Sequence, residues 1–154
     1  MNKKSQFYII TAVILLAMTS GFFMPKLSYD TDTKFREVGD NYIREASFAA
    51  NTGNLDDFSR KFVDYAGIKE QNFGLAYIYA KGRNVTVLNL IKKTIYINEF
   101  KLDFNQTLTI GRESSITLTK ESDQYFFNTS DAPKISAFFY SETGSTKKVY
   151  VKNE

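Results

Sequence analysis

The sequence predicts an α+β protein: an N-terminal transmembrane helix, one or two amphipathic helices, then an antiparallel β-rich domain, a sandwich or curled sheet of about eight strands. Three observations predict this order. An apolar run without charges occupies residues 7–24, apolar residues recur at helical spacing within 33–66, and the period changes to two within 72–152.

The apolar run from Phe7 to Met24 has the length of a membrane span. About 18 residues at 1.5 Å each give roughly 27 Å, close to the hydrocarbon thickness of a bilayer. Lys3 and Lys4 precede the run, and this positive flank predicts a cytoplasmic N-terminus. We therefore expect a single-pass cell-membrane protein, with residues 1–25 as leader and anchor helix and 26–154 as an extracytoplasmic domain.

Two other interpretations of the run stay open. A cleaved secretory signal peptide would have an unusually long hydrophobic region here, and Ala17, Thr19 and Gly21 form only a weak cleavage site. A buried helix of a soluble protein would require a small domain to cover a uniformly apolar helix on all sides.

Two helices are expected between the anchor and the strands. Apolar residues spaced from Phe35 to Ala50 predict an amphipathic helix over about 33–50, ended by Gly53. A second helix begins after Asn54 as N-cap, has Asp57 in capping-box position and is closed by Gly67. Its apolar face is expected to contain Leu55, Phe58, Phe62, Tyr65 and Ala66. We expect both helices to pack on a sheet, and the same helices would join an anchor to a head.

The second half of the chain has the residue pattern of short antiparallel strands. β-Branched and aromatic residues alternate with polar ones, and Gly82, Gly111, Pro133 and Gly144 separate the segments. No helical pattern occurs between them, which favours antiparallel pairing. The expected strands are Leu75–Ala80, Val85–Ile91, Thr94–Phe100, Leu108–Ile110, Ile116–Thr119, Tyr125–Phe127, Ile135–Tyr140 and Val149–Val151.

Composition excludes several kinds of chemistry. The chain has no Cys and no His, which excludes disulfides, thiolate chemistry, zinc–histidine sites and histidine-dependent triads. The net charge is +3, and subtracting Lys3 and Lys4 leaves +1, so nucleic acid is not an expected partner. No Walker loop, nucleophile elbow or dinucleotide fingerprint is present. We therefore expect no enzyme activity, no cofactor and no metal.

Two pairs of acidic residues are candidate ligands for calcium, which prefers several oxygen atoms. Asp30 and Asp32 lie in a polar linker, and Asp56 and Asp57 lie at the start of the second helix. Because no EF-hand spacing is present, helix capping is the expected role. No two carboxylates are identified that would face one another as in a glycosidase.

Three N-x-S/T sequons begin at Asn84, Asn105 and Asn128, each near an expected turn or strand edge. On the predicted outer side of the membrane these asparagines are candidates for N-glycosylation. A chain with this content of Asn, Ser and Thr contains about two sequons by chance, so the motif alone does not establish modification.

Aromatic residues are the remaining candidates for a binding surface. Tyr125–Phe127 and Phe138–Tyr140 place aromatic side chains on both faces of a strand. Core packing explains one face. A subunit contact or a ligand platform would explain the other, but we expect the helices to cover it.

The chain begins with Lys3-Lys4-Ser5-Gln6-Phe7-Tyr8, followed directly by the apolar run. These residues, about 20 in all, resemble the class III signal sequence of archaeal type IV pilin-like proteins. In that family a short basic leader ends in a small residue, and a prepilin peptidase cuts just before a Gln. Carried over, cleavage would fall between Ser5 and Gln6, and the apolar helix would stay on the mature protein.

The resemblance implies a membrane-anchored structural protein of the cell surface, a pilin-like subunit with an outward β-rich head for assembly or adhesion. Its expected partners are the membrane and copies of itself or other pilin-like subunits. Many filament-forming pilins place a Glu a few residues into the mature helix, whereas Ile10 stands at the most comparable position here. The alternative is an uncleaved signal anchor on a monomeric, membrane-tethered binding module.

Overall fold

The computed structural model describes residues 31–153, with side chains from Thr33 onward. The predicted leader, anchor and processing site within 1–25, together with Asp30 and the side chain of Asp32, lie outside the described residues. Neither helix in the described part is long and apolar enough to cross a membrane.

Two antiparallel helices form one layer of the domain. Helix α2 spans Thr31–Asn51 and helix α3 spans Leu55–Lys69. Tyr42 of α2 connects them, because its hydroxyl shares a 2.8 Å hydrogen bond with Ser59 and its ring packs on Phe58. The chain reverses between the helices at Gly53, whose φ of +76° is a left-handed conformation favoured by glycine. The prediction that Gly53 follows the first helix is confirmed.

The second helix begins after its N-cap residue Asn54, as predicted, but three details are wrong. The capping box does not form, because the side chain of Asn54 makes no cap hydrogen bond and Asp57 pairs instead with Lys61 at 2.7 Å. The helix continues two residues past Gly67, because the backbone becomes extended only at Glu70. Tyr65 is 58% exposed and so is not part of the buried stripe.

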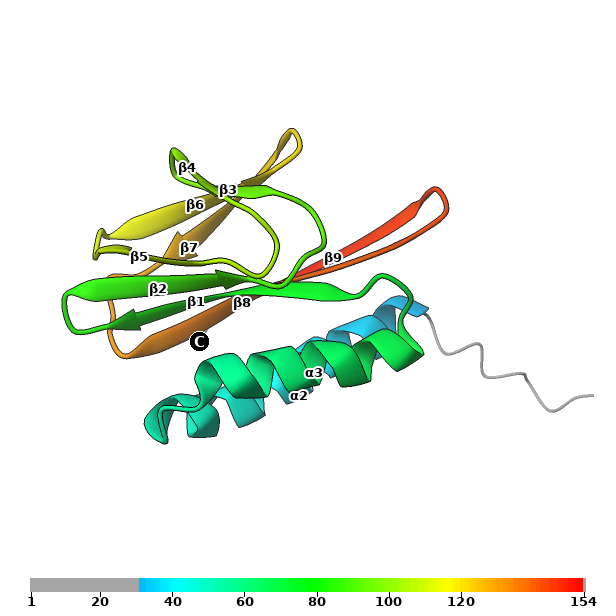
Figure 1. The fold of residues 1–154 in the computed structure, drawn as a ribbon, viewed down its shortest axis with the longest axis horizontal. Helices are drawn as coiled ribbons and strands as arrows, with labels where there is room; N and C mark the ends of the chain where they lie inside the picture. Colours follow the sequence, from blue (N-terminus) through cyan, green and yellow to red (C-terminus); the bar gives the residue numbers. More distant parts are fainter. Residues whose placement is uncertain (1–30, 154) are drawn as a thin grey trace, which may run out of the picture. The chain divides into compact units, whose positions relative to one another are not determined.

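In the described part of the chain, nine antiparallel strands form two sheets, whereas the sequence predicts eight segments (Figure 1). The additional strand arises because the predicted segment Thr94–Phe100 is interrupted by a turn at Asn98, whose φ is +52°. Ile97 therefore pairs with Phe100 in a short hairpin. The strands are β1 Gly74–Lys81, β2 Asn84–Asn89, β3 Ile95–Ile97, β4 Phe100–Leu102, β5 Thr107–Gly111, β6 Ser115–Lys120, β7 Asp123–Asn128, β8 Lys134–Thr143 and β9 Thr146–Asn153.

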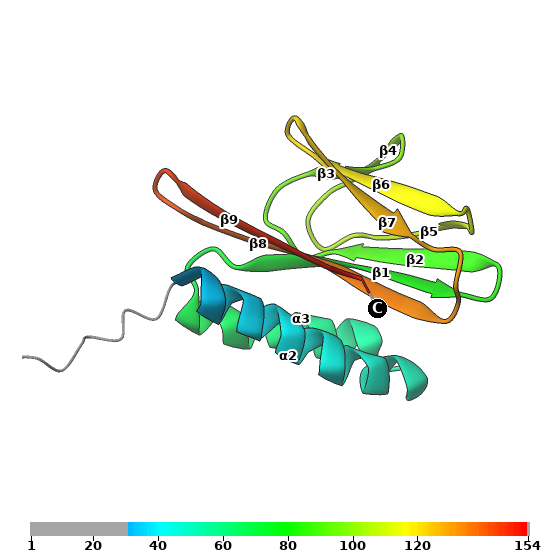
Figure 2. The same ribbon diagram turned by 180° about the vertical axis from the view of Figure 1, so that it is seen from behind.

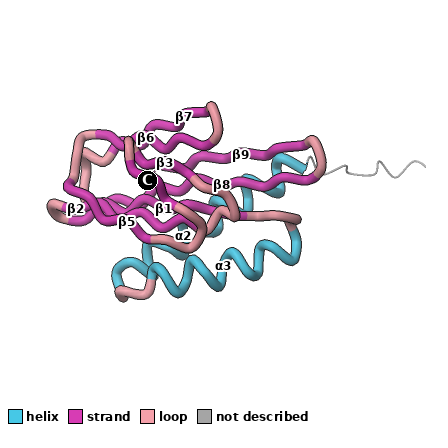
Figure 3. Tube along the Cα trace, turned by 45° about the horizontal axis from the view of Figure 1, so that its top comes forward, coloured by secondary structure: helices cyan, strands magenta, loops and turns pink. Residues whose placement is uncertain are grey.

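The domain has three layers, with the larger sheet in the middle. The strand order is β5-β2-β1-β8-β9 in the five-stranded sheet and β4-β3-β6-β7 in the four-stranded sheet. Figures 1 and 2 show α2 and α3 against one face of the five-stranded sheet, and β3, β4, β6 and β7 over its other face. The tube view in Figure 3 shows the same division between the helices and the strands. The α+β class and the antiparallel β-rich domain are confirmed, and of the two predicted forms, sandwich or curled sheet, the structure shows two packed sheets.

Side chains of the central strands alternate between two cores. On β8, Phe139 packs with the helices, whereas Phe138 and Tyr140 pack between the two sheets. On β1, Leu75 belongs to the helix-side core and Ala76 to the core between the sheets. Because successive residues of a strand point to opposite faces, a strand covered on both sides must be apolar at nearly every position.

Candidate functional site

The predicted coverage of the aromatic strand faces is confirmed for one strand and wrong for the other. The ring of Phe139 lies 5.5 Å from that of Tyr42 in α2, so the helices do cover the second face of β8. On β7, Phe127 is buried between the sheets, but Phe126 is 66% exposed. The helices cannot reach Phe126, because they lie on the opposite face of the other sheet.

The outward face of the four-stranded sheet is therefore an exposed aromatic surface. Tyr96 of β3 pairs with Thr119 of β6, and Phe126 of β7 pairs with Thr117. Both aromatic side chains are exposed, and the two threonines lie between them on the central strand β6. We call Tyr96, Thr117, Thr119 and Phe126 the outer aromatic face. Aromatic side chains are enriched at surfaces that contact other proteins.

All three sequon asparagines are exposed, but they lie in different surroundings. Asn84 begins β2, Asn128 ends β7, and Asn105 lies in a turn with φ of +66°. The side-chain oxygen of Asn128 accepts hydrogen bonds from the backbone N–H and the hydroxyl of Ser130, at 2.8 and 2.6 Å. Their glycosylation stays a prediction.

Arg112 brings two of the sequons to one end of the domain. Its guanidinium donates to the carbonyl oxygen of Thr129 at 2.7 Å and to that of Gly82 at 3.2 Å. The carbonyl of Thr129 lies next to Asn128, and that of Gly82 lies two residues before Asn84. Two segments far apart in the sequence therefore accept hydrogen bonds from the same arginine. Because three backbone acceptors, including that of Ser130, occupy the guanidinium, Arg112 has a structural role.

Asp56 and Asp57 do not converge on a common site. Asp56 accepts a hydrogen bond from the hydroxyl of Tyr77, whereas Asp57 pairs with Lys61 on the same helix. Burial raises the pKa of Tyr77, and the neighbouring Asp56 carboxylate raises it further. Both acids lie in the first turn of α3, where a negative charge is favoured by the helix dipole. Within residues 31–153, no three acidic residues are close enough together to hold a metal ion.

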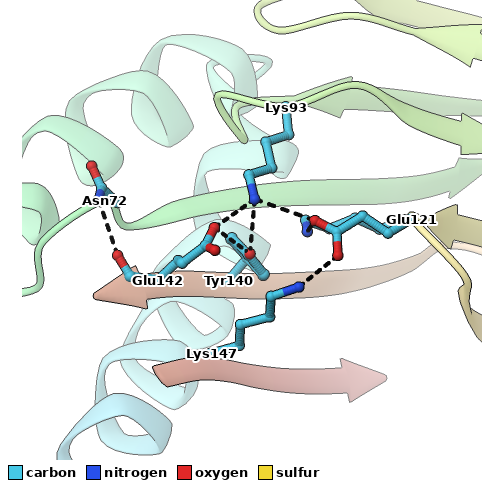
Figure 4. A network of polar contacts seen from close by, with 7 residues as sticks. Asn72, Lys93, Glu121, Tyr140, Glu142 and Lys147 are labelled. Atoms are coloured by element: carbon cyan, nitrogen blue, oxygen red, sulfur yellow. Dashed lines mark hydrogen bonds and ion pairs between the residues drawn. The ribbon is translucent and has the colours of Figure 1, made fainter. Parts of the chain in front are cut away.

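A cluster of ion pairs connects the two sheets (Figure 4). The ammonium group of Lys93, before β3, lies 2.5 Å from Glu142 of β8 and 3.2 Å from Glu121 of the β6–β7 turn. Lys147 of β9 contacts the other oxygen of Glu121 at 2.6 Å, and Tyr140 donates to Glu142 at 2.7 Å. We call Lys93, Glu121, Tyr140, Glu142 and Lys147 the inter-sheet cluster.

Lys120 supports this cluster from the interior. Only 4% of its side chain is exposed, and its ammonium group lies 3.8 Å from the centre of the Tyr140 ring and 3.0 Å from Glu121. A buried lysine is stable only with such partners. A hollow beside the cluster is lined by Lys92, Lys93, Asn72, Ile91, Tyr140 and Glu142. Because Lys93 and Glu142 already neutralise each other, the arrangement is suited to holding the sheets together and not to acid–base catalysis.

Lysines shift the pKa of both acids in the cluster. Hydrogen bonds from Lys147, Lys120 and Lys93, in decreasing order of effect, lower the pKa of Glu121 from 4.5 to about 2. The pKa of Glu142 is lowered chiefly by Lys93 and then by Tyr140. The same contact with Glu142 raises the pKa of Lys93.

We predict that Glu121→Gln makes the stability of the fold less dependent on pH between neutral pH and pH 2. A carboxyl whose pKa is lower in the folded state stabilises the fold above pH 4.5, and this contribution is lost as the pH falls toward 2. The difference in urea midpoint between the native chain and the variant should therefore be largest at neutral pH and shrink toward pH 2. Glu99→Gln is the matched control, because Glu99 makes no salt bridge within the described residues. Equal profiles for both variants would contradict the prediction.

The inter-sheet cluster could not be found in the sequence. Its members lie far apart in the chain, and isolated Lys and Glu residues at strand ends are common on any surface. Only the pairing of β8 with β9 and the approach of the β6–β7 turn bring them together.

The fold and these surfaces define a general class, a two-helix layer on an antiparallel β-sandwich. No family model, curated protein or solved structure matches this chain.

Proposed function

We propose that this protein is a membrane-anchored structural protein of the cell surface, a pilin-like subunit with an outward β-rich head. The observation that carries the proposal is the uncharged run Phe7–Met24 directly after Lys3-Lys4-Ser5-Gln6. The packing of the head agrees with it. Both faces of the five-stranded sheet are covered by described elements, so the head has hydrophobic cores of its own.

The proposed mechanism is mechanical. The apolar helix holds the subunit in the membrane or, after removal of the leader, packs against copies of itself. The head contributes surface for contact, and the outer aromatic face is the part suited to it, because exposed rings gain most from burial in an interface. No step in this mechanism requires a cofactor or a metal.

The second candidate is a monomeric binding module tethered by an uncleaved anchor. One observation favours it, namely that Ile10 stands where many filament-forming pilins have a Glu. The inter-sheet cluster fits either function, since both need a stable head outside the cytoplasm.

N-terminal mass analysis of the full chain, purified from a membrane that contains a prepilin peptidase, tests the proposal. We expect a mature protein that begins at Gln6. A chain that keeps Lys3 and Lys4 would support the tethered module, and a start beyond Thr19 would contradict membrane anchoring altogether. Ser5→Phe is the control, because a large residue before the cut should keep the leader in place while the anchor still inserts.

A further inference from the structure

One end of the domain contains the start of α2, the end of α3 and the β8–β9 hairpin (Figures 1 and 3). The ring of Phe35, in the first turns of α2, lies 6.0 Å from that of Phe73, just after α3. Lys148 of β9 pairs with Glu70 at 3.0 Å. We call this region the entry end, because the described chain enters the domain here.

The entry end exposes large apolar side chains on α3. Ile68 is 84% exposed and Tyr65 is 58% exposed, although both belong to a helix whose other face is well packed. The ammonium group of Lys69 lies 4.8 Å from the centre of the Tyr65 ring. An aliphatic residue, a tyrosine and a lysine on one helical turn match the side chains that favour the boundary between lipid and water.

Three exposed basic residues belong to the segments that begin or end here. Arg36 lies in the first turns of α2, Lys69 is the last residue of α3, and Lys92 lines a hollow with Asn72, which follows α3. None of the three makes a salt bridge within the described residues. Cations of this kind are attracted to the phosphates of anionic lipids.

The length of the connecting chain limits how far this end can lie from a membrane. Six residues, 25–30, separate the apolar run from α2. Even fully extended, six residues span at most about 21 Å. Part of that length must cross the headgroup region, which adds roughly 5–8 Å beyond the hydrocarbon on each side. A membrane anchor would thus keep the entry end close to the lipid surface at high effective concentration.

We propose that the entry end rests on the outer lipid surface. Ile68 and Tyr65 enter the interfacial region, and Arg36, Lys69 and Lys92 contact lipid phosphates. The proposal rests on the proposed function, since it requires the apolar run to span the bilayer. The proposal also gives the domain an orientation. The entry end faces the lipid surface, and the turn between α2 and α3 points away from it.

The chain contains no tryptophan, so a single introduced tryptophan reports on one position alone. Ile68→Trp in the full chain places this probe at the entry end, and Phe48→Trp is the matched control. Phe48 is 71% exposed and lies 17 residues along α2 from Thr31, about 26 Å at 1.5 Å per residue. Both variants are reconstituted into vesicles of phosphatidylcholine and phosphatidylglycerol in equal parts, with and without bromine on the acyl chains.

We expect I68W to emit at shorter wavelength in vesicles and to be quenched by the brominated lipid, whereas F48W shows neither effect. Equal quenching of both variants, or of neither, would overturn the proposal. A blue shift of I68W without bromine quenching would indicate burial against another protein copy and would also overturn it. Failure of the anchor itself is distinguishable, because the full chain would then not float with the vesicles.

A charge reversal tests the phosphate contacts separately. Adding Lys69→Glu and Lys92→Glu to I68W should reduce the quenching toward the level of F48W. Unchanged quenching would show that the basic side chains do not hold this end on the lipid. It would contradict the proposed contacts with lipid phosphates.

Discussion

Replacing Phe139 with alanine should lower the free energy of unfolding by about 3–5 kcal/mol, the usual effect of truncating a buried phenylalanine. Phe139 is fully buried and joins the helix layer to the five-stranded sheet. Its ring lies 5.5 Å from Tyr42 of α2 and 5.8 Å from Tyr150 of β9. Removing it leaves a cavity lined by large rings, which cannot collapse without moving a helix. Denaturant unfolding of the full chain in detergent, followed by circular dichroism, measures the loss.

Phe126→Ala is the matched control for this prediction. It removes the same atoms from a side chain on the outer aromatic face, where the ring is already in contact with water. The expected change in unfolding free energy is within about 0.5 kcal/mol. If Phe126→Ala destabilised the chain as strongly as Phe139→Ala, the outward face of the four-stranded sheet would be covered in the folded protein, contrary to the structure.

Gly74→Ala should destabilise the domain by about 1–3 kcal/mol or more, because the added methyl group meets backbone. A Cβ at this position would lie 2.8 Å from the Cα of Ile91 and 2.9 Å from the carbonyl oxygen of Leu90. Backbone atoms cannot rotate away as a side chain can. The Leu90 N–H donates to the Leu75 carbonyl at 2.8 Å, so relieving the clash also disturbs this connection. Thermal and urea unfolding both measure the effect.

Gly67→Ala has the opposite expected sign. Gly67 lies inside α3 with nothing within 4 Å of an added Cβ. Alanine is favoured over glycine in a helix by about 0.5–1 kcal/mol, so the variant should unfold at higher denaturant concentration. The same Gly→Ala change is thus expected to destabilise the domain at Gly74, for a steric reason, and to stabilise it at Gly67, because of helix propensity. Similar changes in both variants would contradict the role assigned to Gly74.

Local patterns predicted the elements well where neighbouring residues determine them. The helix over about 33–50 is observed as Thr31–Asn51, and the predicted Ile135–Tyr140 lies inside β8. The prediction was wrong where one residue decides the backbone. Asn98 adopts a positive φ, which asparagine tolerates better than most residues, and converts one predicted strand into a hairpin.

The candidate surfaces were predicted less completely than the elements. The second aromatic face of Phe138–Tyr140 was correctly expected under the helices, but the same expectation was wrong for Phe126. Periodicity shows that a strand has two apolar faces and does not show which sheet the strand joins. The inter-sheet cluster was missed for a related reason, since its charges come together only through contacts between distant segments.

The sequence by itself determined the order of helices and strands, the change from helical to two-residue spacing and the presence of an apolar run of membrane-spanning length. These follow from residue spacing, because 3.6-residue and two-residue periods are local properties of the backbone. The tertiary structure alone decided the strand order, the division into two sheets and the choice of face that the helices cover. These depend on hydrogen bonds between residues far apart in the chain, such as Gly74 and Tyr140, whose pairing leaves no local signal.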